Sequence, residues 1–169
     1  VNVSELLEEA RAILAPTLPK TITLNIELNA VLWPVRGDAT ELSQVLMNLA
    51  INARDVMPDG GRLSIEASNT TVQNDHANGD ALPPGRYVQI SVIDNGVGIA
   101  PQLIDKVFDP FFTTKEQGKG TGLGLATCMG IVTHHGGTMS VESAVNRGTR
   151  FNVLLPAEQQ AVSESLPFA

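Results

Sequence analysis

The sequence has little cysteine, no long apolar run and no cluster of lysine and arginine. A single cysteine, Cys128, among 169 residues excludes an internal disulfide and suits a reducing compartment. We expect it to be a small, buried core residue. The apolar stretches fall far short of the roughly 20 residues that a membrane helix needs. A formal net charge of -7 without a basic run argues against holding nucleic-acid phosphates. These absences predict a cytoplasmic domain that contacts neither nucleic acid nor membrane directly, whether or not its parent protein is membrane-anchored.

What is present fits one domain with a real core, since 43% of the residues are hydrophobic. No signal peptide is visible, and the abrupt amphipathic start without a methionine suggests a fragment of a longer protein. We predict one domain over residues 1–157, followed by a tail or linker over residues 158–169.

The spacing of apolar residues predicts the order helix, strand, helix, strand, strand, helix, strand, strand. The helices are expected from a cap at Ser4 to Pro16, from a cap at Asp38 to about Met57, and from Gly122 to about His134. The strands are expected over residues 21–28, 62–68, 87–94, 138–143 and 149–155. Short turns between adjacent strands indicate a mixed, largely antiparallel sheet. One amphipathic face per helix then favours an α/β two-layer sandwich with the helices on one face.

Two asparagines stand out on the long second helix. From Val45 to Ala53 every residue is apolar except Asn48 and Asn52, which lie four positions apart and therefore on one face. A buried amide without a partner costs roughly 1–3 kcal/mol. The pair is therefore either bonded to nearby backbone or offers neutral oxygen ligands to a hard cation such as Mg²⁺.

A carboxylate ends the strand over residues 87–94. Asp94 continues the core-facing parity of that strand. On its own this reads as a strand-ending turn in which Asp94 caps backbone amides. The alternative is an acceptor for the exocyclic amine of a flat base, bordered by two glycines that allow close approach and by two apolar walls: Gly96, Val97, Gly98 and Ile99.

Four glycines at alternate positions lead into the third predicted helix: Gly118, Gly120, Gly122 and Gly124. Glycines bring amide N–H groups toward an anion, and a helix N-terminus adds partial positive charge. A P-loop needs Ser or Thr after Gly-Lys, and Lys119 is followed by glycine; the dinucleotide pattern G-x-G-x-x-G also fails in every frame. The segment is therefore a flexible hinge or a different kind of anion cradle.

Three of the five phenylalanines fall within five positions, at Phe108, Phe111 and Phe112. We expect Phe108 to anchor this loop to the core. The remainder is expected to form a mobile lid that leaves Lys115 and Lys119 free to approach phosphates.

Together, in this order and spacing, the four segments resemble the nucleotide-binding boxes of the histidine kinase/Hsp90/gyrase/MutL ATPase superfamily. Residues 48–55 are similar to the N box, residues 94–99 to the G1 box, residues 108–112 to the F box and residues 118–124 to the G2 box. The F box and the Gly-Thr-Gly-Leu-Gly-Leu sequence favour the histidine kinase branch. The resemblance covers residues 3–156 and implies a Bergerat-type ATP-binding fold.

The resemblance implies a role for each matching residue. Asn52 is implied as the Mg²⁺ ligand with Asn48 in support, and Asp94 as the acceptor for the adenine amino group. The implied nucleotide-binding set is Asp94, Gly96, Val97, Gly98, Ile99, Phe108, Gly118, Gly120, Thr121, Gly122, Leu123 and Gly124. Many histidine kinases carry Lys or Arg three residues after the metal-binding asparagine, where this chain has Asp55. The cation that meets the γ-phosphate is therefore left open among Arg54, Lys115 and Lys119.

As a histidine kinase catalytic domain, the chain is expected to bind ATP and Mg²⁺. It would pass the γ-phosphate to a histidine on a separate dimerisation domain, with a response regulator downstream. None of His76, His134 and His135 is followed by the acidic residue that typically comes after a phosphoacceptor. The acceptor domain is therefore expected before Val1.

Three alternatives remain open from the sequence. The first is an ATP-hydrolysing clamp, although such enzymes carry a water-activating glutamate where this chain has Asn48. The second is a degenerate nucleotide- or partner-binding module without phosphotransfer. The presence of Asp55, where many histidine kinases have Lys or Arg, keeps this alternative open. The third is a serine kinase of an anti-sigma factor, which the F box disfavours.

Overall fold

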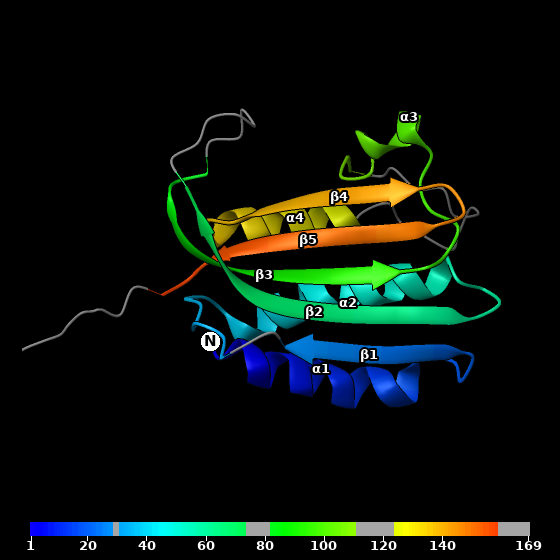
Figure 1. Cartoon of the computed structure of the whole chain (residues 1–169), viewed down its shortest axis with the longest axis horizontal. Helices are drawn as coiled ribbons and strands as arrows, with labels where there is room; N and C mark the ends of the chain where they lie inside the picture. The colour runs from blue at the N-terminus through cyan, green and yellow to red at the C-terminus, as the bar shows by residue number, and fades with distance from the viewer. Residues whose placement is uncertain (29–30, 74–81, 111–123, 159–169) are drawn as a thin grey trace, which may run out of the picture.

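A five-stranded sheet forms one layer of the molecule, and the three longer helices lie together on one of its faces (Figure 1). The computed structural model describes residues 1–28, 31–73, 82–110 and 124–158. The two-layer α/β sandwich predicted from the alternating patterns is confirmed. No helix within these described ranges is long and apolar enough to cross a membrane.

The strand order in the sheet is β1-β2-β3-β5-β4. The strands are β1 Ile22–Leu28, β2 Gly61–Val72, β3 Gly85–Asp94, β4 Thr138–Ala144 and β5 Gly148–Pro156. β1 and β2 run parallel because a helix crosses over between them, and the other three pairs are antiparallel. The largely antiparallel sheet is therefore confirmed. Most strands extend slightly beyond the predicted ranges, and β2 extends furthest because it pairs along the whole of β3.

The helices are α1 Val3–Thr17, α2 Ala39–Asp55, the short α3 Pro101–Ile104 and α4 Gly124–His134. The apolar pattern did not predict α3, which is a single turn without buried residues. Without a buried face, such a turn leaves no helical periodicity to read.

The cap predicted at Ser4 is wrong. Asn2 caps α1 instead, because its side-chain oxygen accepts the Glu5 N–H at 3.1 Å. The stop predicted at Pro16 is close, since α1 ends one residue later. Pro16 is tolerated inside the last turn, where Leu18 N–H still donates to Leu14 O at 2.9 Å.

The cap predicted at Asp38 is confirmed for α2. One carboxylate oxygen of Asp38 accepts the N–H groups of Thr40 and Glu41, at 2.8 and 3.1 Å. The returning half of a capping box is absent, because Asp38 N–H donates to His135 Nε2 at 3.1 Å rather than to Glu41. A contact from the far end of α4 thus completes the start of α2.

The core lies between the helices and the inner face of the sheet. It joins the apolar stripe of α2 to alternate residues of the strands: Leu42, Val45, Leu46, Leu49, Ala50, Ala53, Leu63, Ile65, Ala67, Val88, Ile90, Val92, Phe151 and Val153. Cys128 is fully buried between α4 and α2, as expected. The domain boundary expected at residue 157 stays a prediction, although Glu158 N–H still donates to Pro34 O at 2.7 Å.

Candidate functional site

The two asparagines of α2 have different surroundings. Asn48 and Asn52 are both half-buried on the same face of the helix. The Asn48 side chain hydrogen-bonds with the Cys128 thiol, so the core accounts for part of its polarity. The Asn52 amide has no hydrogen-bond partner among the residues that the structure describes. Asn52 is therefore the amide that remains available to a ligand.

Cys128 contributes no reactive group to this region. Its Sγ lies 3.8 Å from Val45 O, and burial raises the pKa of the thiol to about 11. At neutral pH the thiol is protonated and is neither a nucleophile nor a metal ligand.

Asp94 is a carboxylate held almost out of water at the end of β3. Its side chain is 5% exposed, and Oδ1 accepts the Gly96 N–H at 2.9 Å. Burial raises the pKa of Asp94 above its ordinary value, and hydrogen bonds from the backbone of Gly96 and Thr149 oppose that rise. Among the described residues, no lysine or arginine forms an ion pair with Asp94. A desolvated carboxylate with lone pairs to spare is well suited to accept a hydrogen bond from a ligand.

A polar row crosses the inner face of the sheet beside Asp94. Asp94 of β3 is in register with Thr149 of β5, and Thr149 is in register with Ser143 of β4. Their hydroxyl oxygens, Thr149 Oγ1 and Ser143 Oγ, lie 2.9 Å apart. The next inward row of the same three strands is apolar: Val92, Phe151 and Val141. The end of the sheet that carries Asp94 is therefore polar, whereas the next row of this face belongs to the core.

Sequence reasoning missed Thr149 and Ser143 as site residues. Both continue the core-facing parity of their strands, as Asp94 does in β3, so the same signal applied. What the sequence alone did not supply was the pairing of β5 with both β3 and β4.

The segment after Asp94 passes between α2 and the end of the β4–β5 hairpin. Val97 N–H donates to Val56 O at 3.3 Å, and a Cβ on Gly96 would lie 2.4 Å from that same oxygen. Gly98 has φ +76°, and its Cβ would lie 2.1 Å from Ala144 O. Only glycine fits at either position. This close passage brings the Asn52 end of α2 next to Asp94.

The two apolar walls expected here differ in exposure. Ile99 packs against the core, whereas the Val97 side chain is 52% exposed. Contact of either residue with a base stays a prediction. Phe108 anchors its loop as expected, because its ring packs edge-on against Phe151 at 6.1 Å between centroids.

Arg54 is occupied by its neighbour. Its Nε and Nη2 donate to Asp55 Oδ1 at 3.2 and 3.1 Å. Lys115 and Lys119, the other two candidate cations, lie outside the described residues, as do Gly118, Gly120, Thr121, Gly122 and Leu123. Gly124 opens α4, and a Cβ there would meet nothing within 4 Å.

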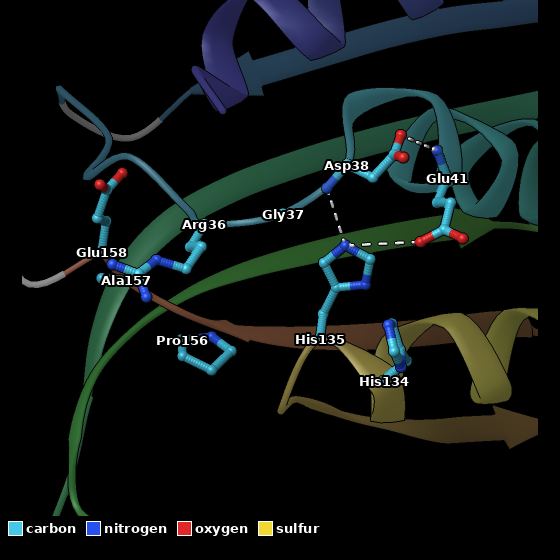
Figure 2. Close-up of a pocket in the computed structure, with 9 residues that line it drawn as sticks. All are labelled: Arg36, Gly37, Asp38, Glu41, His134, His135, Pro156, Ala157 and Glu158. Carbon is cyan, nitrogen blue, oxygen red and sulfur yellow. Dashed lines mark hydrogen bonds and ion pairs between the residues drawn. The ribbon is translucent and has the colours of Figure 1, made fainter.

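A separate cavity of about 680 Å³ lies at the opposite ends of α2 and α4 (Figure 2). His135 lies beside it between the two helices; its side chain is 4% exposed and its Nδ1 lies 2.8 Å from Ile131 O. Asp38, Glu41, Arg36 and Glu158 complete much of the rim. Because none of the predicted nucleotide-binding residues lines it, this cavity is distinct from the Asp94 pocket. His135 therefore has a structural role between α2 and α4.

Comparison with known proteins points to one family. Residues 37–159 match the model of the family described as histidine kinase-, DNA gyrase B- and HSP90-like ATPases. The sensor kinase CckA of Brucella abortus is 41% identical over 157 residues, which are 92% of this chain and 17% of that protein.

Two solved structures share the fold. The nucleotide-free catalytic domain of the histidine kinase ThkA superposes with a TM-score of 0.74 at 32% identity, over 93% of each chain. Full-length ShkA in complex with AMPPNP superposes with a TM-score of 0.76 at 26% identity, over 96% of this chain and 31% of that one. The chain thus spans about a sixth of the length of CckA and about a third of ShkA.

Proposed function

The chain belongs to the family of histidine kinase-, DNA gyrase B- and HSP90-like ATPases, and from this premise we propose that it binds Mg·ATP and presents the γ-phosphate to a histidine on a partner domain. The observation that carries the proposal is Asp94, a carboxylate 5% exposed that lacks an ion-pair partner among the described residues. Such a group is costly to keep unless a ligand uses it. Its position at the end of an apolar sheet face suits a flat base with one exocyclic amine.

Base recognition would rest on Asp94 and the polar row beside it. The Asp94 oxygens accept from the adenine amino group while Gly96 N–H holds Oδ1 at 2.9 Å. Gly96 and Gly98, at the close passage beside α2 and β4, let the backbone border the base. Ile99 supplies an apolar wall from its packed position.

The residues of α2 fit a magnesium ion at the phosphates. Asn52 offers an amide oxygen without a partner among the described residues, and Mg²⁺ prefers oxygen ligands while it keeps several waters. Asn48 supports this face of the helix from its contact with Cys128. When bound, the ion would neutralise charge on the β- and γ-phosphates.

The phosphates would also need cations and backbone amides from the chain. Since Asp55 already accepts two hydrogen bonds from Arg54, we assign contact with the γ-phosphate to Lys115 or Lys119. The glycines of the G2 box would approach the triphosphate at the start of α4. Catalysis would then consist mainly of positioning and charge neutralisation.

Transfer to a histidine is favoured over hydrolysis. In hydrolysing relatives a glutamate one turn before the metal-binding asparagine activates water, and here that place is Asn48, a neutral amide hydrogen-bonded with Cys128. Neither of the two histidines among the described residues is assigned as the phosphate acceptor. His135 forms hydrogen bonds with backbone groups, and His134 is exposed without the sequence context of an acceptor. The phosphate acceptor is therefore assigned to a separate dimerisation domain, with a response regulator downstream.

The test is phosphorylation in trans. The chain is mixed with Mg²⁺, ATP labelled on the γ-phosphate and a dimerisation domain of a sensor histidine kinase supplied as a separate chain. Acid-labile, base-stable label on that domain, lost with Asn52→Ala, supports the proposal. If the chain binds ATP but labels no dimerisation domain, whether from the cognate kinase or from relatives, the phosphotransfer proposal fails. The chain is then a nucleotide-binding module without phosphotransfer.

A further inference from the structure

Ser143 belongs to none of the nucleotide-binding motifs. Its hydroxyl nevertheless connects three segments near Asp94: β4, the loop after β3 and the start of β5. Ser143 Oγ lies 2.7 Å from Ile99 N, 2.9 Å from Gly148 O and 2.9 Å from Thr149 Oγ1. The partners come from the loop after β3 and from the first two residues of β5. One side chain on β4 thus holds both the backbone that borders the base and the hydroxyl next to Asp94.

Counting protons fixes the direction of these hydrogen bonds. A serine hydroxyl has one proton to donate and two lone pairs to accept with. Ile99 N–H can only donate and Gly148 C=O can only accept, so Ser143 accepts from the first and donates to the second. The remaining lone pair of Ser143 then accepts the Thr149 proton, at 2.9 Å. This arrangement uses every donor and acceptor of the Ser143 hydroxyl.

The direction of the Thr149 hydroxyl decides what it offers to a ligand. With its proton given to Ser143, Thr149 Oγ1 presents only lone pairs to the rest of the pocket. Thr149 is 5% exposed and in register with Asp94, and side chains directly opposite on neighbouring strands have Cβ atoms about 5 Å apart. Asp94 and Thr149 therefore form one wall made of acceptors.

We propose that Ser143 is a specificity-determining positioning residue: it holds Thr149 Oγ1 as an acceptor and fixes Ile99, so that the Asp94 wall accepts adenine and rejects guanine. The inference rests on the proposed function of this pocket. Adenine offers an amino group at its 6-position, which an acceptor wall binds. Guanine offers a carbonyl oxygen there, which the same wall repels.

Removing the Ser143 hydroxyl should weaken this selection. In Ser143→Ala the Thr149 proton loses its acceptor and turns toward Asp94 or the ligand, where it favours a carbonyl, while Ile99 N–H loses its partner. One hydrogen bond of this kind corresponds to about a three- to tenfold change in affinity. We expect the Kd for ATP to rise by about that factor, and the ratio of the GTP Kd to the ATP Kd to fall by a similar factor.

The control is Ser140→Ala, the same substitution on the same strand at an exposed position. It should leave both Kd values unchanged. Ser143→Thr keeps the hydroxyl and should restore the preference for ATP, which a loss of packing alone does not explain. Where Ser143→Ala proves unfolded by circular dichroism, Ser143→Cys is used instead, because a thiol is a weak donor and acceptor; its ATP preference should also fall.

The measurement is calorimetric titration of each variant with ATP and with GTP in the presence of Mg²⁺. If the parent chain binds neither nucleotide, the proposed function fails and the role of Ser143 fails with it. If the parent prefers ATP but folded Ser143→Ala, or its Cys substitute, keeps the same preference within about twofold, the proposed function stands and the role of Ser143 is overturned. Failure of Ser143→Thr to restore the preference would likewise overturn it.

Discussion

At the scale of single residues, Asp94 sets function against stability. The proposed function needs an acceptor, and Asp94 is 5% exposed, with hydrogen bonds from two backbone groups that only partly offset its burial. Such an arrangement disfavours the charged form of the carboxyl in the folded chain. Stability in the absence of nucleotide is therefore reduced by the group to which we assign recognition of the base.

The first prediction concerns Asp94→Asn. The amide keeps an oxygen for Gly96 N–H but presents a weaker acceptor, and its N–H₂ group conflicts with the adenine amino group. We expect ATP affinity to fall at least tenfold, about 1.4 kcal/mol, while the fold is kept. Calorimetry measures the first effect and circular dichroism the second; full ATP affinity in the variant would remove Asp94 from base recognition.

The same substitution has a pH signature without nucleotide. The folded pKa of Asp94 lies above the ordinary 3.8, so its contribution to stability is fully present below pH 3.8 and is lost as pH rises through the raised folded value. Asparagine does not ionise. The variant should therefore be more stable than the parent at pH 7, and this gap should narrow as pH falls toward 4 in thermal unfolding. If the difference in stability between variant and parent stayed constant across this pH range, burial would not disfavour the charged form of the Asp94 carboxyl.

The second prediction concerns Asn52. Asn52→Ala removes the half-buried α2 asparagine whose amide has no partner among the described residues. We expect it to abolish the gain in ATP affinity that Mg²⁺ gives the parent chain, with little change in unfolding temperature, because no hydrogen bond within the described part of the molecule is lost. Titrations with and without Mg²⁺ measure the effect, and Gln44→Ala at an exposed position of the same helix is the control. An Mg²⁺ effect that survives in Asn52→Ala would move the metal site elsewhere.

At the scale of elements, α2 and α4 are joined at two places by different side-chain contacts. Near the pocket, the Asn48 amide meets the Cys128 thiol. At the other end, His135, which directly follows α4, accepts Asp38 N–H at 3.1 Å (Figure 2). Its Nδ1 lies 2.8 Å from Ile131 O. Since Ile131 O can only accept, Nδ1 carries the proton and Nε2 is free to accept from Asp38. The contact between His135 and Asp38 thus joins α2 and α4 at residues outside the proposed nucleotide site.

The third prediction is that the contact between His135 and Asp38 stabilises the fold but does not affect nucleotide binding. His135→Ala removes the acceptor of the exposed Asp38 N–H and the packing of an imidazole whose side chain is 4% exposed, at a cost of about 0.5–3 kcal/mol. The unfolding temperature should fall by several degrees, while the ATP Kd should change by less than about twofold, because the cavity beside His135 contains no predicted nucleotide-binding residue. His134→Ala, at the neighbouring exposed position, should be neutral for both. Unchanged stability in His135→Ala would show that the cap does not depend on this contact.

At the scale of the whole molecule, most local signals in the sequence predicted the structure correctly, whereas contacts between residues far apart in the sequence were not predicted. Strand alternation, the Asp38 cap and the inward parity of Asp94 are encoded within a few residues, so the sequence predicted the two-layer sandwich and the pocket carboxylate. The bond from His135 to Asp38 spans 97 positions, and the row that joins Asp94, Thr149 and Ser143 exists only once β5 pairs on both sides. Such contacts need the strand order, which residue patterns do not contain. At the N-terminus the predicted cap, Ser4, and the observed cap, Asn2, lie two positions apart, and propensity does not separate these residue types.

The central claim concerns the whole chain as a nucleotide-binding unit, and one titration tests it most directly. The folded chain is titrated with ATP by calorimetry, with and without Mg²⁺, and with GTP under the same conditions. The account predicts saturable binding of one ATP per chain, strengthened by Mg²⁺ and clearly preferred over GTP. A folded chain that binds no ATP, or binds GTP as well as ATP, would contradict the assignment of the Asp94 pocket as an adenine site.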